Sequence, residues 1–348
     1  MIKRIILITS LTLLIFYFLL LTFNFSHAMG WLFGKSCRSD SISYHAPCWG
    51  ENNKIYFIKK VTFAVESENP DLVTGGTYFI HDVKYFLCSM NYDGTEKKEI
   101  KEVMCEKDIN RLKREYKRRY RKEWTGGSKS DAYMSYCKDT NKLVYNVEWG
   151  MWSITVDGTD ERLLDYEGIH PSWSPDGKEI VYEIFKKGIW IMNADGDNKH
   201  RLSTESRIET FDNKTYVVYD DESPIWSPKG DLIAFVCNFW IWVMKPDGSE
   251  RRKVWKTSHL SDWSPDGTMI MTGGRIVDLN GNSVQLFEEE KEEYIHGLWS
   301  PDGTMCIGNR DFVLFDSKTG KIVGDPLSVG VLPQSGKHFV YKKPDNIW

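Results

Sequence analysis

The sequence predicts an all-β protein, a β-propeller of six or seven four-stranded blades, from two observations. The first is a repeating segment, clearest at residues 172–196, that opens on S-W-S-P-D-G and contains two strand-like runs. The second is its spacing, because openers at Trp173, Trp226, Trp263 and Trp299 follow one another at intervals of 53, 37 and 36 residues. A single blade cannot cover its own apolar faces, so repeats of about 40 residues are expected to stack into a closed ring.

Within the repeat, the residue types indicate a turn, a strand, a second strand and another turn. Pro175 and Gly177 suit a β-turn, because proline fixes one φ and glycine accepts a positive one. Residues 180–184 then alternate in polarity as strands do, Gly188 breaks the run, and Asp195-Gly196 closes a hairpin. The same hairpin turn recurs in other repeats, which argues against a calcium loop at residues 193–197.

Weaker openers extend the series at Cys48, Tyr136 and Leu332. Few residues follow the last of them, so residues 29–44 are expected to supply a strand that completes its blade, which would give seven blades. A six-bladed ring with an extra terminal strand is the alternative. We expect Trp173, Trp226, Trp263 and Trp299 to be buried between neighbouring blades.

The run W-S-P-D-G-K-x-I from Trp173, followed by I-W-x-M-N-x-D-G, resembles the repeat of TolB-type propellers over roughly residues 44–343. Similar repeats form the propellers of prolyl-oligopeptidase-like enzymes and of oligogalacturonate lyase, so the resemblance implies a fold and leaves function open. A prolyl-oligopeptidase architecture is not expected, because it needs a separate hydrolase domain, and the chain contains no G-x-S-x-G sequence.

Residues 1–28 read as a targeting segment ahead of the propeller at residues 29–348. Lys3 and Arg4 precede an uncharged apolar run at residues 5–23, and Ser26-His27-Ala28 suits an export cleavage site. A cleaved signal peptide predicts a periplasmic or extracellular protein. The alternative is an uncleaved anchor in the inner membrane through residues 5–23, because 19 apolar residues are just long enough to span a bilayer.

Two insertions interrupt the repeats, at about residues 62–81 and 104–129. The first is expected to form an extended hairpin. In the second, Ile109, Leu112, Tyr116 and Tyr120 have helical spacing, and residues 107–122 carry a local charge of +7. We therefore name Arg114, Arg118 and Arg121 as candidate ligand-binding residues for an anionic surface, beside the interpretation of a solvated helix face.

Seven cysteines occur without any C-x-x-C pair, so a zinc ribbon is not expected. In an exported protein one or two disulfides are plausible, with Cys37–Cys48 and Cys88–Cys105 as the simplest pairs. The mature body would carry a formal charge of −6, since residues 1–28 contribute two positive charges to the total of −4. This acidic balance argues against a nucleic-acid partner.

Two functions follow. The first is an exported, non-catalytic, monomeric propeller that binds a protein or a cell-envelope ligand, without a cofactor. The second is a tunnel-centred lyase or hydrolase acting on an acidic polysaccharide, and whether the chain is an enzyme is left open. Polar residues that recur where the blades begin, at the tunnel, would favour a site there.

Histidines do recur at that place. His45, His170 and His296 each lie three residues before an opener, and His259 lies four before Trp263. Imidazoles converging on the tunnel would suit a divalent metal ion that activates water, which makes these four the candidate metal ligands. The alternative is that each histidine bonds to backbone within its own blade.

Overall fold

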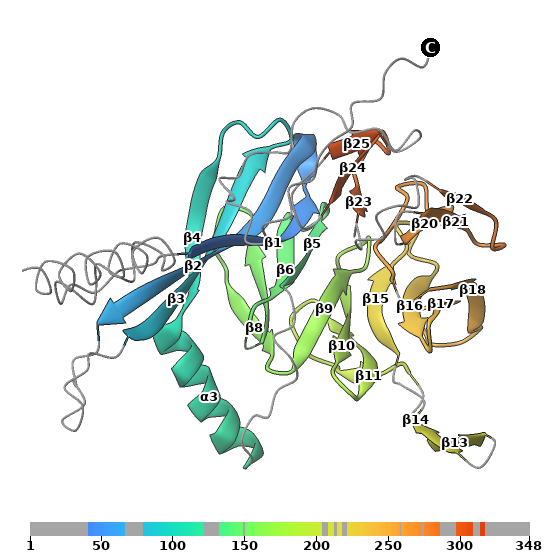
Figure 1. The fold of residues 1–348 in the computed structure, drawn as a ribbon, viewed down its shortest axis with the longest axis horizontal. Coiled ribbons are helices and arrows are strands. Elements are labelled where there is room, and N and C mark those ends of the chain that lie inside the picture. Colours follow the sequence, from blue (N-terminus) through green and yellow to red (C-terminus); the bar gives the residue numbers. More distant parts are fainter. Residues whose placement is uncertain are drawn as a thin grey trace, which may run out of the picture. The chain divides into compact units, whose positions relative to one another are not determined.

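In the part of the chain that it describes, a computed structural model contains six consecutive antiparallel sheets and a separate two-stranded hairpin (Figure 1). The structure describes residues 41–66, 79–121, 132–148, 150–203, 208–211, 214–217, 221–257, 259–272, 275–285, 297–308 and 314–316. Strand order within each sheet follows the sequence, as expected for blades whose strands run from the inside outward.

The first three sheets have four strands each. The first contains β1 (Ser41–Trp49), the short 3-10 turn η1 (Glu51–Asn53), β2 (Lys54–Glu66), β3 (Phe79–Asn91) and β4 (Lys98–Cys105). The second contains β5 (Tyr133–Cys137), β6 (Lys142–Asn146), β7 (Met151–Thr155) and β8 (Arg162–Asp165). The third contains β9 (Gly168–Trp173), β10 (Glu179–Ile184), β11 (Gly188–Asn193) and β12 (His200–Arg201).

The remaining sheets repeat the pattern. The fourth contains β15 (Glu222–Trp226), β16 (Ile233–Cys237), β17 (Trp240–Met244) and β18 (Arg252–Lys256). The fifth contains β19 (Asp262–Trp263), β20 (Met269–Thr272), β21 (Arg275–Asp278) and β22 (Ser283–Gln285). The sixth contains β23 (Gly297–Trp299), β24 (Met305–Gly308) and β25 (Leu314–Asp316).

The chain divides into two compact units. One unit combines the residues up to Ser41 with residues 61–83. Of this unit the structure describes mainly the ends of the paired strands β2 and β3. The other comprises residues 42–60 and 84–348 and contains the six sheets. Everything below concerns this second unit.

The six sheets form a closed ring. Inner strand β9 contacts β5 and β15, β15 contacts β19, and β19 contacts β23. Between the fourth and fifth sheets, the Trp263 indole Nε1 donates to the carbonyl of Ile225 at 3.1 Å. The Trp49 Nε1 donates in the same way to Leu298 at 3.1 Å, so the sixth sheet is the neighbour of the first. The described residues therefore form a ring of six blades, as in the six-bladed alternative, and the composite seventh blade expected around Leu332 lies outside the described residues.

The repeated tryptophan also joins the blades through its backbone. The N–H groups of Trp173 and Trp226 donate to the hydroxyls of Ser135 and Ser172 in the preceding blade, at 3.2 and 3.1 Å. The four predicted tryptophans are all buried, with 3 to 7% of their surface exposed. Burial of Trp173, Trp226, Trp263 and Trp299 is thus confirmed.

One repeat begins a residue later than the sequence spacing indicated. The opener of the first blade was expected at Cys48, but it is Trp49 that bonds to the neighbouring blade. The next residue, Gly50, donates its N–H to the carbonyl of Lys54, just as Ser174 donates to Glu179 in the third blade. The reason is a shorter turn, with one residue fewer between the first and second strands.

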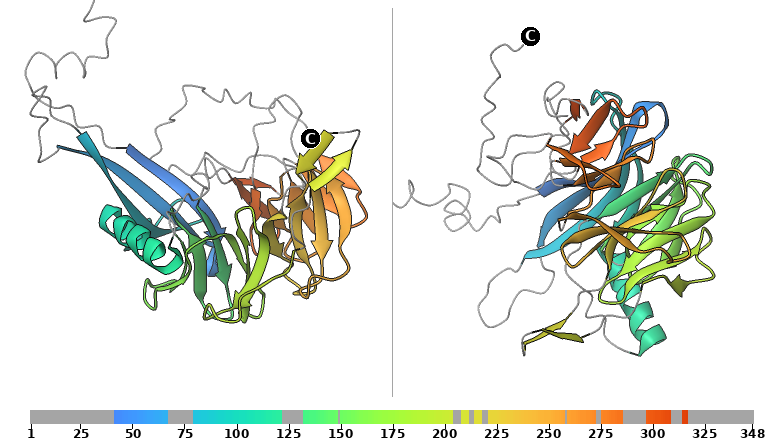
Figure 2. Two further views of the ribbon diagram at one scale, coloured as in Figure 1. Left: turned by 90° about the horizontal axis from the view of Figure 1, so that it is seen from below. Right: turned by 90° about the vertical axis from the view of Figure 1, so that its right-hand side faces the viewer.

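The two ends of the ring differ in what they carry. Because the strands are antiparallel, three features of every blade lie at the same face of the ring, which we call the loop face. They are the start of the inner strand, the turn between the second and third strands, and the end of the fourth strand. The S-P-D-G turns lie at the opposite face, called the turn face. The connections between blades cross the loop face, and two of them are enlarged, by α3 (Glu106–Tyr120) and by the hairpin of β13 (Ile208–Phe211) and β14 (Lys214–Val217) (Figure 2).

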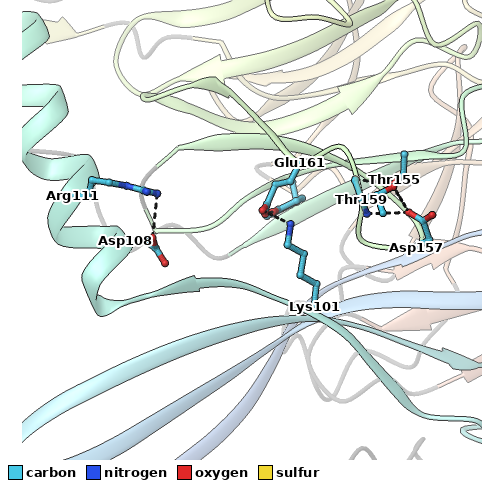
Figure 3. A network of polar contacts seen from close by, with 8 residues as sticks. Lys101, Asp108, Arg111, Thr155, Asp157, Thr159 and Glu161 are labelled. Atoms are coloured by element: carbon cyan, nitrogen blue, oxygen red, sulfur yellow. Dashed lines mark hydrogen bonds and ion pairs between the residues drawn. The ribbon is translucent and has the colours of Figure 1, made fainter.

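Polar contacts hold the first two blades together beside α3 (Figure 3). Lys101 of β4 pairs with Glu161, next to β8, at 2.7 Å. The turn of the second blade is fixed by Asp157, whose carboxylate accepts bonds from Thr155 and Thr159; these bonds lower the pKa of Asp157 to about 2. Turns fixed by an aspartate in this way recur along the turn face.

The expected Cys88–Cys105 disulfide is wrong, and of the expected Cys37–Cys48 pair, Cys37 lies outside the described residues. Cys48, Cys88 and Cys105 are free thiols. In the β3–β4 pair Cys105 lies opposite Lys84 and Cys88 lies opposite Glu99, so the two sulfurs are several residues out of register. Cys88 is buried, and desolvation raises its pKa to about 12, which keeps it a small apolar side chain.

Candidate functional site

The inner strands of all six blades surround one cavity at the loop face. Its volume is about 590 Å³. Its wall includes His45, His170 and His259, the acid Asp262, and the ring of Tyr133. The three histidines come from the first, third and fifth blades, so they alternate around the axis. The sequence repeat therefore places imidazoles around one mouth of the tunnel.

A second cavity, of about 600 Å³, lies at the turn face. Ser135, Ser172, Ile225 and Asp262 line both cavities. These four residues each precede the repeated aromatic residue of their blade, so this position forms the waist of the axial tunnel. Of the four, only Asp262 is ionisable.

The backbone is strained where the inner strands begin. Ala46, His170 and Ser223 stand three residues before Trp49, Trp173 and Trp226, and all three adopt left-handed backbone angles, with φ of 53°, 49° and 52°. The pairing of β9 with β10 and of β15 with β16 shifts register there, as in a β-bulge. Left-handed non-glycine residues persist only where the surroundings enforce them, and they cluster at binding and catalytic sites.

At His170 and Ser223, a polar side chain from the preceding blade enforces this conformation. Asn146 ends β6 and accepts the N–H of His170 at 3.2 Å, while Glu183, at the equivalent place in β10, accepts the N–H of Ser223 at 2.9 Å. In β16 the equivalent residue is Val236, which has no acceptor, and Leu260 in the next blade is not left-handed. A bulge therefore occurs where the preceding blade supplies a polar side chain as acceptor, and it is absent where that side chain is apolar.

His170 is held in a fixed orientation. Its Nδ1 lies 2.7 Å from the Glu183 carboxylate and 3.2 Å from the Ser223 hydroxyl, and its ring meets Tyr133 edge-on with 4.0 Å between ring centroids. Glu183 is buried, with 4% of its surface exposed. Because glutamate and serine both approach Nδ1, the group is not a proton relay of the serine-hydrolase type, which needs the serine on Nε2. Instead, the contact fixes the imidazole so that Nε2 remains for a ligand.

Asp262 is the titratable group at the tunnel waist. Its two carboxylate oxygens accept the N–H groups of Trp263 and Trp299, at 2.8 and 2.9 Å. The residue as a whole is only partly covered, but its carboxyl group is desolvated, and this burial raises its pKa to about 7 against the opposing effect of the two N–H donors. Such a carboxyl can hold or release a proton near neutral pH.

The other two histidines of the wall lie at a slightly different place. His45 and His259 each stand four residues before the tryptophan of their blade. His45 Nε2 bonds to the Ser43 hydroxyl at 2.8 Å. Burial lowers the pKa of His259, which favours its neutral form. The fourth candidate, His296, lies outside the described residues.

The metal hypothesis stays a prediction. Within the described part of the chain, no three His, Cys, Asp or Glu side chains are close enough together to hold a metal ion. A centre built on His45, His170 and His259 would in any case need a ligand that bridges three separate blades.

Sequence reasoning missed Glu183, Ser223 and Asp262. A signal for Asp262 was present, because an acid precedes W-S-P-D-G in that repeat alone, while serine, isoleucine and leucine stand there in the others. Glu183 was hidden within a strand pattern, and its role depends on a contact with the next blade.

The candidate cationic residues lie elsewhere, around α3. The predicted helical spacing is confirmed, since Ile109, Leu112 and Tyr116 are buried beneath the helix. Arg114 and Arg118 are exposed on α3, and Arg121 ends the helix in a left-handed conformation. Across the described residues no helix is long and apolar enough to cross a membrane, and residues 5–23 are not among them.

Comparison with known proteins gives no family. No family model matches the chain. It is 31% identical to dipeptidyl peptidase 4 of Sus scrofa and 30% identical to that of Felis catus, over 50% of this chain and 21% of each relative. An uncharacterized protein of Agrobacterium fabrum is 25% identical over 41% of this chain and 52% of its own. The chain thus spans about a fifth of the peptidases that it matches.

Among solved structures, an oligogalacturonate lyase in complex with manganese matches with a TM-score of 0.44 and 13% identity, covering 81% of this chain and 89% of the lyase. A second oligogalacturonate lyase, from Vibrio parahaemolyticus, gives a TM-score of 0.42 at 13% identity, over 77% and 87%. The assignment as a propeller depends on the sheets and contacts described above.

Proposed function

We propose that this chain is an exported propeller that binds a segment of a protein partner at the loop-face mouth of its tunnel, without catalysis. One observation carries the proposal: imidazoles from three blades line a single cavity, and one of them is held by a buried glutamate at a strained backbone position. The fold itself does not need this strain, because the fifth blade forms without it. The resemblance of the repeat to TolB-type propellers is in keeping with a binding role.

The cavity wall favours an uncharged or weakly charged ligand. Among the described lining residues there are histidines, serines, tyrosines and one acid, but no lysine or arginine. A polyanionic sugar would find no permanent positive charge there. A peptide segment, in contrast, offers the N–H and C=O groups that imidazole and hydroxyl side chains can pair with.

Cross-linking tests this function directly. A photoreactive residue in place of Met134, which lines the loop-face cavity, should cross-link a defined polypeptide segment in the native host. The same residue in place of Asp139, which lines the turn-face cavity, should not. Changing His170 and His259 together to alanine should reduce the yield about tenfold, as expected for two lost hydrogen bonds.

His200→Ala is the matched control, because His200 is exposed on β12, away from the cavity. Equal cross-linking from both positions, or an unchanged yield in the double variant, would rule out the loop-face mouth as the binding site.

An enzyme is the second candidate, and Asp262 is what favours it. A carboxyl with a pKa of about 7 in the same tunnel as three imidazoles has the properties of a general acid or base. If the protein is a lyase or hydrolase of an acidic polysaccharide, incubation with oligogalacturonate should yield shorter products, and elemental analysis of protein prepared without a metal-affinity tag should show stoichiometric metal. Intact oligosaccharide and metal-free protein would leave the binding function.

Export is a separate expectation from Lys3, Arg4 and the apolar run at residues 5–23. The mass of the protein isolated from its native host should correspond either to a chain starting at Met29 or to the full chain in the membrane fraction. Full-length protein in the soluble cytoplasmic fraction would contradict both versions.

A further inference from the structure

Helix α3 presents a cationic outer face. Its apolar side is covered, because Ile109, Leu112 and Tyr116 are at most 6% exposed. The Tyr116 hydroxyl donates to Glu167 at 2.8 Å, which fixes the helix to the connection between the second and third blades. Eight basic side chains are exposed on the other side and at its end: Lys107, Arg111, Lys113, Arg114, Lys117, Arg118, Arg119 and Arg121.

The acids of this segment do not neutralise that face. Asp108 lies in the first turn, where it pairs with Arg111 at 3.1 Å (Figure 3) and accepts the N–H of Cys105 as part of the helix cap. Glu115 accepts the Tyr166 hydroxyl at 3.2 Å and is therefore directed toward the propeller. Among the described residues, no ion pair involves Arg114, Arg118 or Arg121.

The charge is local to this helix. Residues 107–122 carry +7, so the rest of the chain carries a formal charge of −11. A nucleic acid or other long polyanion would meet repulsion wherever it extended beyond α3. A flat anionic surface that touches the helix alone meets much less, because charges more than about 10 Å away are screened at ordinary salt.

We propose that the outer face of α3 docks on the surface of a bilayer that contains anionic lipids. Clusters of four to eight lysines and arginines on an amphipathic helix are typical of such contacts. A specific protein partner would need apolar or aromatic anchors, and the large aromatic side chain exposed on α3 is Tyr120, 39% exposed, whose ring contacts Tyr116 and Tyr166 on the side toward the propeller. Because the apolar side of α3 is already buried, the helix rests on the headgroups and does not insert.

The experiment compares binding of the full chain to vesicles of 30% phosphatidylglycerol in phosphatidylcholine with binding to pure phosphatidylcholine vesicles. We expect preferential binding to the anionic vesicles that falls steeply as salt rises. Arg114→Gln, Arg118→Gln and Arg121→Gln combined should weaken this binding at least about tenfold. Lys3, Arg4 and the apolar run at residues 5–23 can also bind vesicles, but they are the same in every variant, so the change in binding between variants reports on α3 alone.

The matched control replaces Lys138, Lys178 and Lys245 with glutamine, which removes the same charge from exposed side chains outside α3. This variant should bind the anionic vesicles like the native chain, and thermal melting should show both variants folded. Equal binding to both vesicle types, or equal loss in both variants, would overturn the proposal. Binding to soluble polyglutamate or DNA without vesicle binding would also overturn it, in favour of an acidic macromolecule.

Discussion

Replacing Trp263 with alanine is expected to lower the free energy of unfolding by about 3 to 5 kcal/mol, the range for large-to-small changes in a core. The indole is 3% exposed. It packs with Val236 and Val243 of the fourth blade and Ile270 of its own. Its loss would also leave the carbonyl of Ile225 without the bond that joins the two blades. Urea unfolding followed by tryptophan fluorescence and circular dichroism measures the change.

The control is Phe239→Ala. Phe239 is also a large aromatic residue of the fourth blade, but 65% of it is exposed, so the change should stay within about 0.5 kcal/mol. If Trp263→Ala cost less than about 1 kcal/mol, the tryptophans would not be the contacts that hold neighbouring blades together.

Stability should fall as pH rises from about 4 to 7, because of Asp262. Burial raises the pKa of its carboxyl from 3.8 to about 7 in the folded protein. Between these values the folded chain keeps a proton that the unfolded chain has released, so the free energy of unfolding decreases with pH and levels off above 7. The full decrease is on the order of 4 kcal/mol, at about 1.4 kcal/mol per unit of pKa.

Asp262→Asn should remove this decrease. The measured quantity is the difference between variant and native protein at each pH from 4 to 8, so that titration of His259 and other groups cancels. Because an amide does not titrate, the variant should gain stability relative to the native protein as pH rises from 4 to 8, whatever the difference between the two proteins at pH 4.

Asp266→Asn is the control with the opposite sign. Hydroxyl donors from Ser264 and Thr268 lower the pKa of Asp266, so its contribution is present above pH 4 and disappears below it. It cannot produce a decline between pH 4 and 7. A parallel pH profile for native protein and Asp262→Asn would show that Asp262 ionises normally.

The fold was predictable because its signals are local. Each S-P-D-G turn and each alternating strand is specified within about ten residues, and the same pattern is repeated with Trp173, Trp226, Trp263 and Trp299. The number of blades was not predictable, because it depends on which blade closes the ring by packing against the first. Among the described residues, the bond from Trp49 to Leu298 makes the sixth blade the neighbour of the first, and no spacing within the sequence encodes that bond.

The site was predictable only in part, for a related reason. Histidine positions could be counted from the repeat, and His45, His170 and His259 do line one cavity. What orients His170 is Glu183, thirteen residues further along the chain, and what raises the pKa of Asp262 is desolvation of its carboxyl group in the folded ring. Such effects arise from contacts between elements, which a pattern of residue types does not contain.

The contact between Trp49 and Leu298 also constrains the order of folding. It joins residues 249 positions apart, so the ring cannot close until nearly the whole chain has been synthesised. Until then the first blade has only one neighbour, and the contacts still to form are of high sequence separation, which makes closure slow relative to formation of single blades. This delay keeps the growing chain open during synthesis, and if the chain is exported as proposed, the open form is the one that a translocation channel can thread.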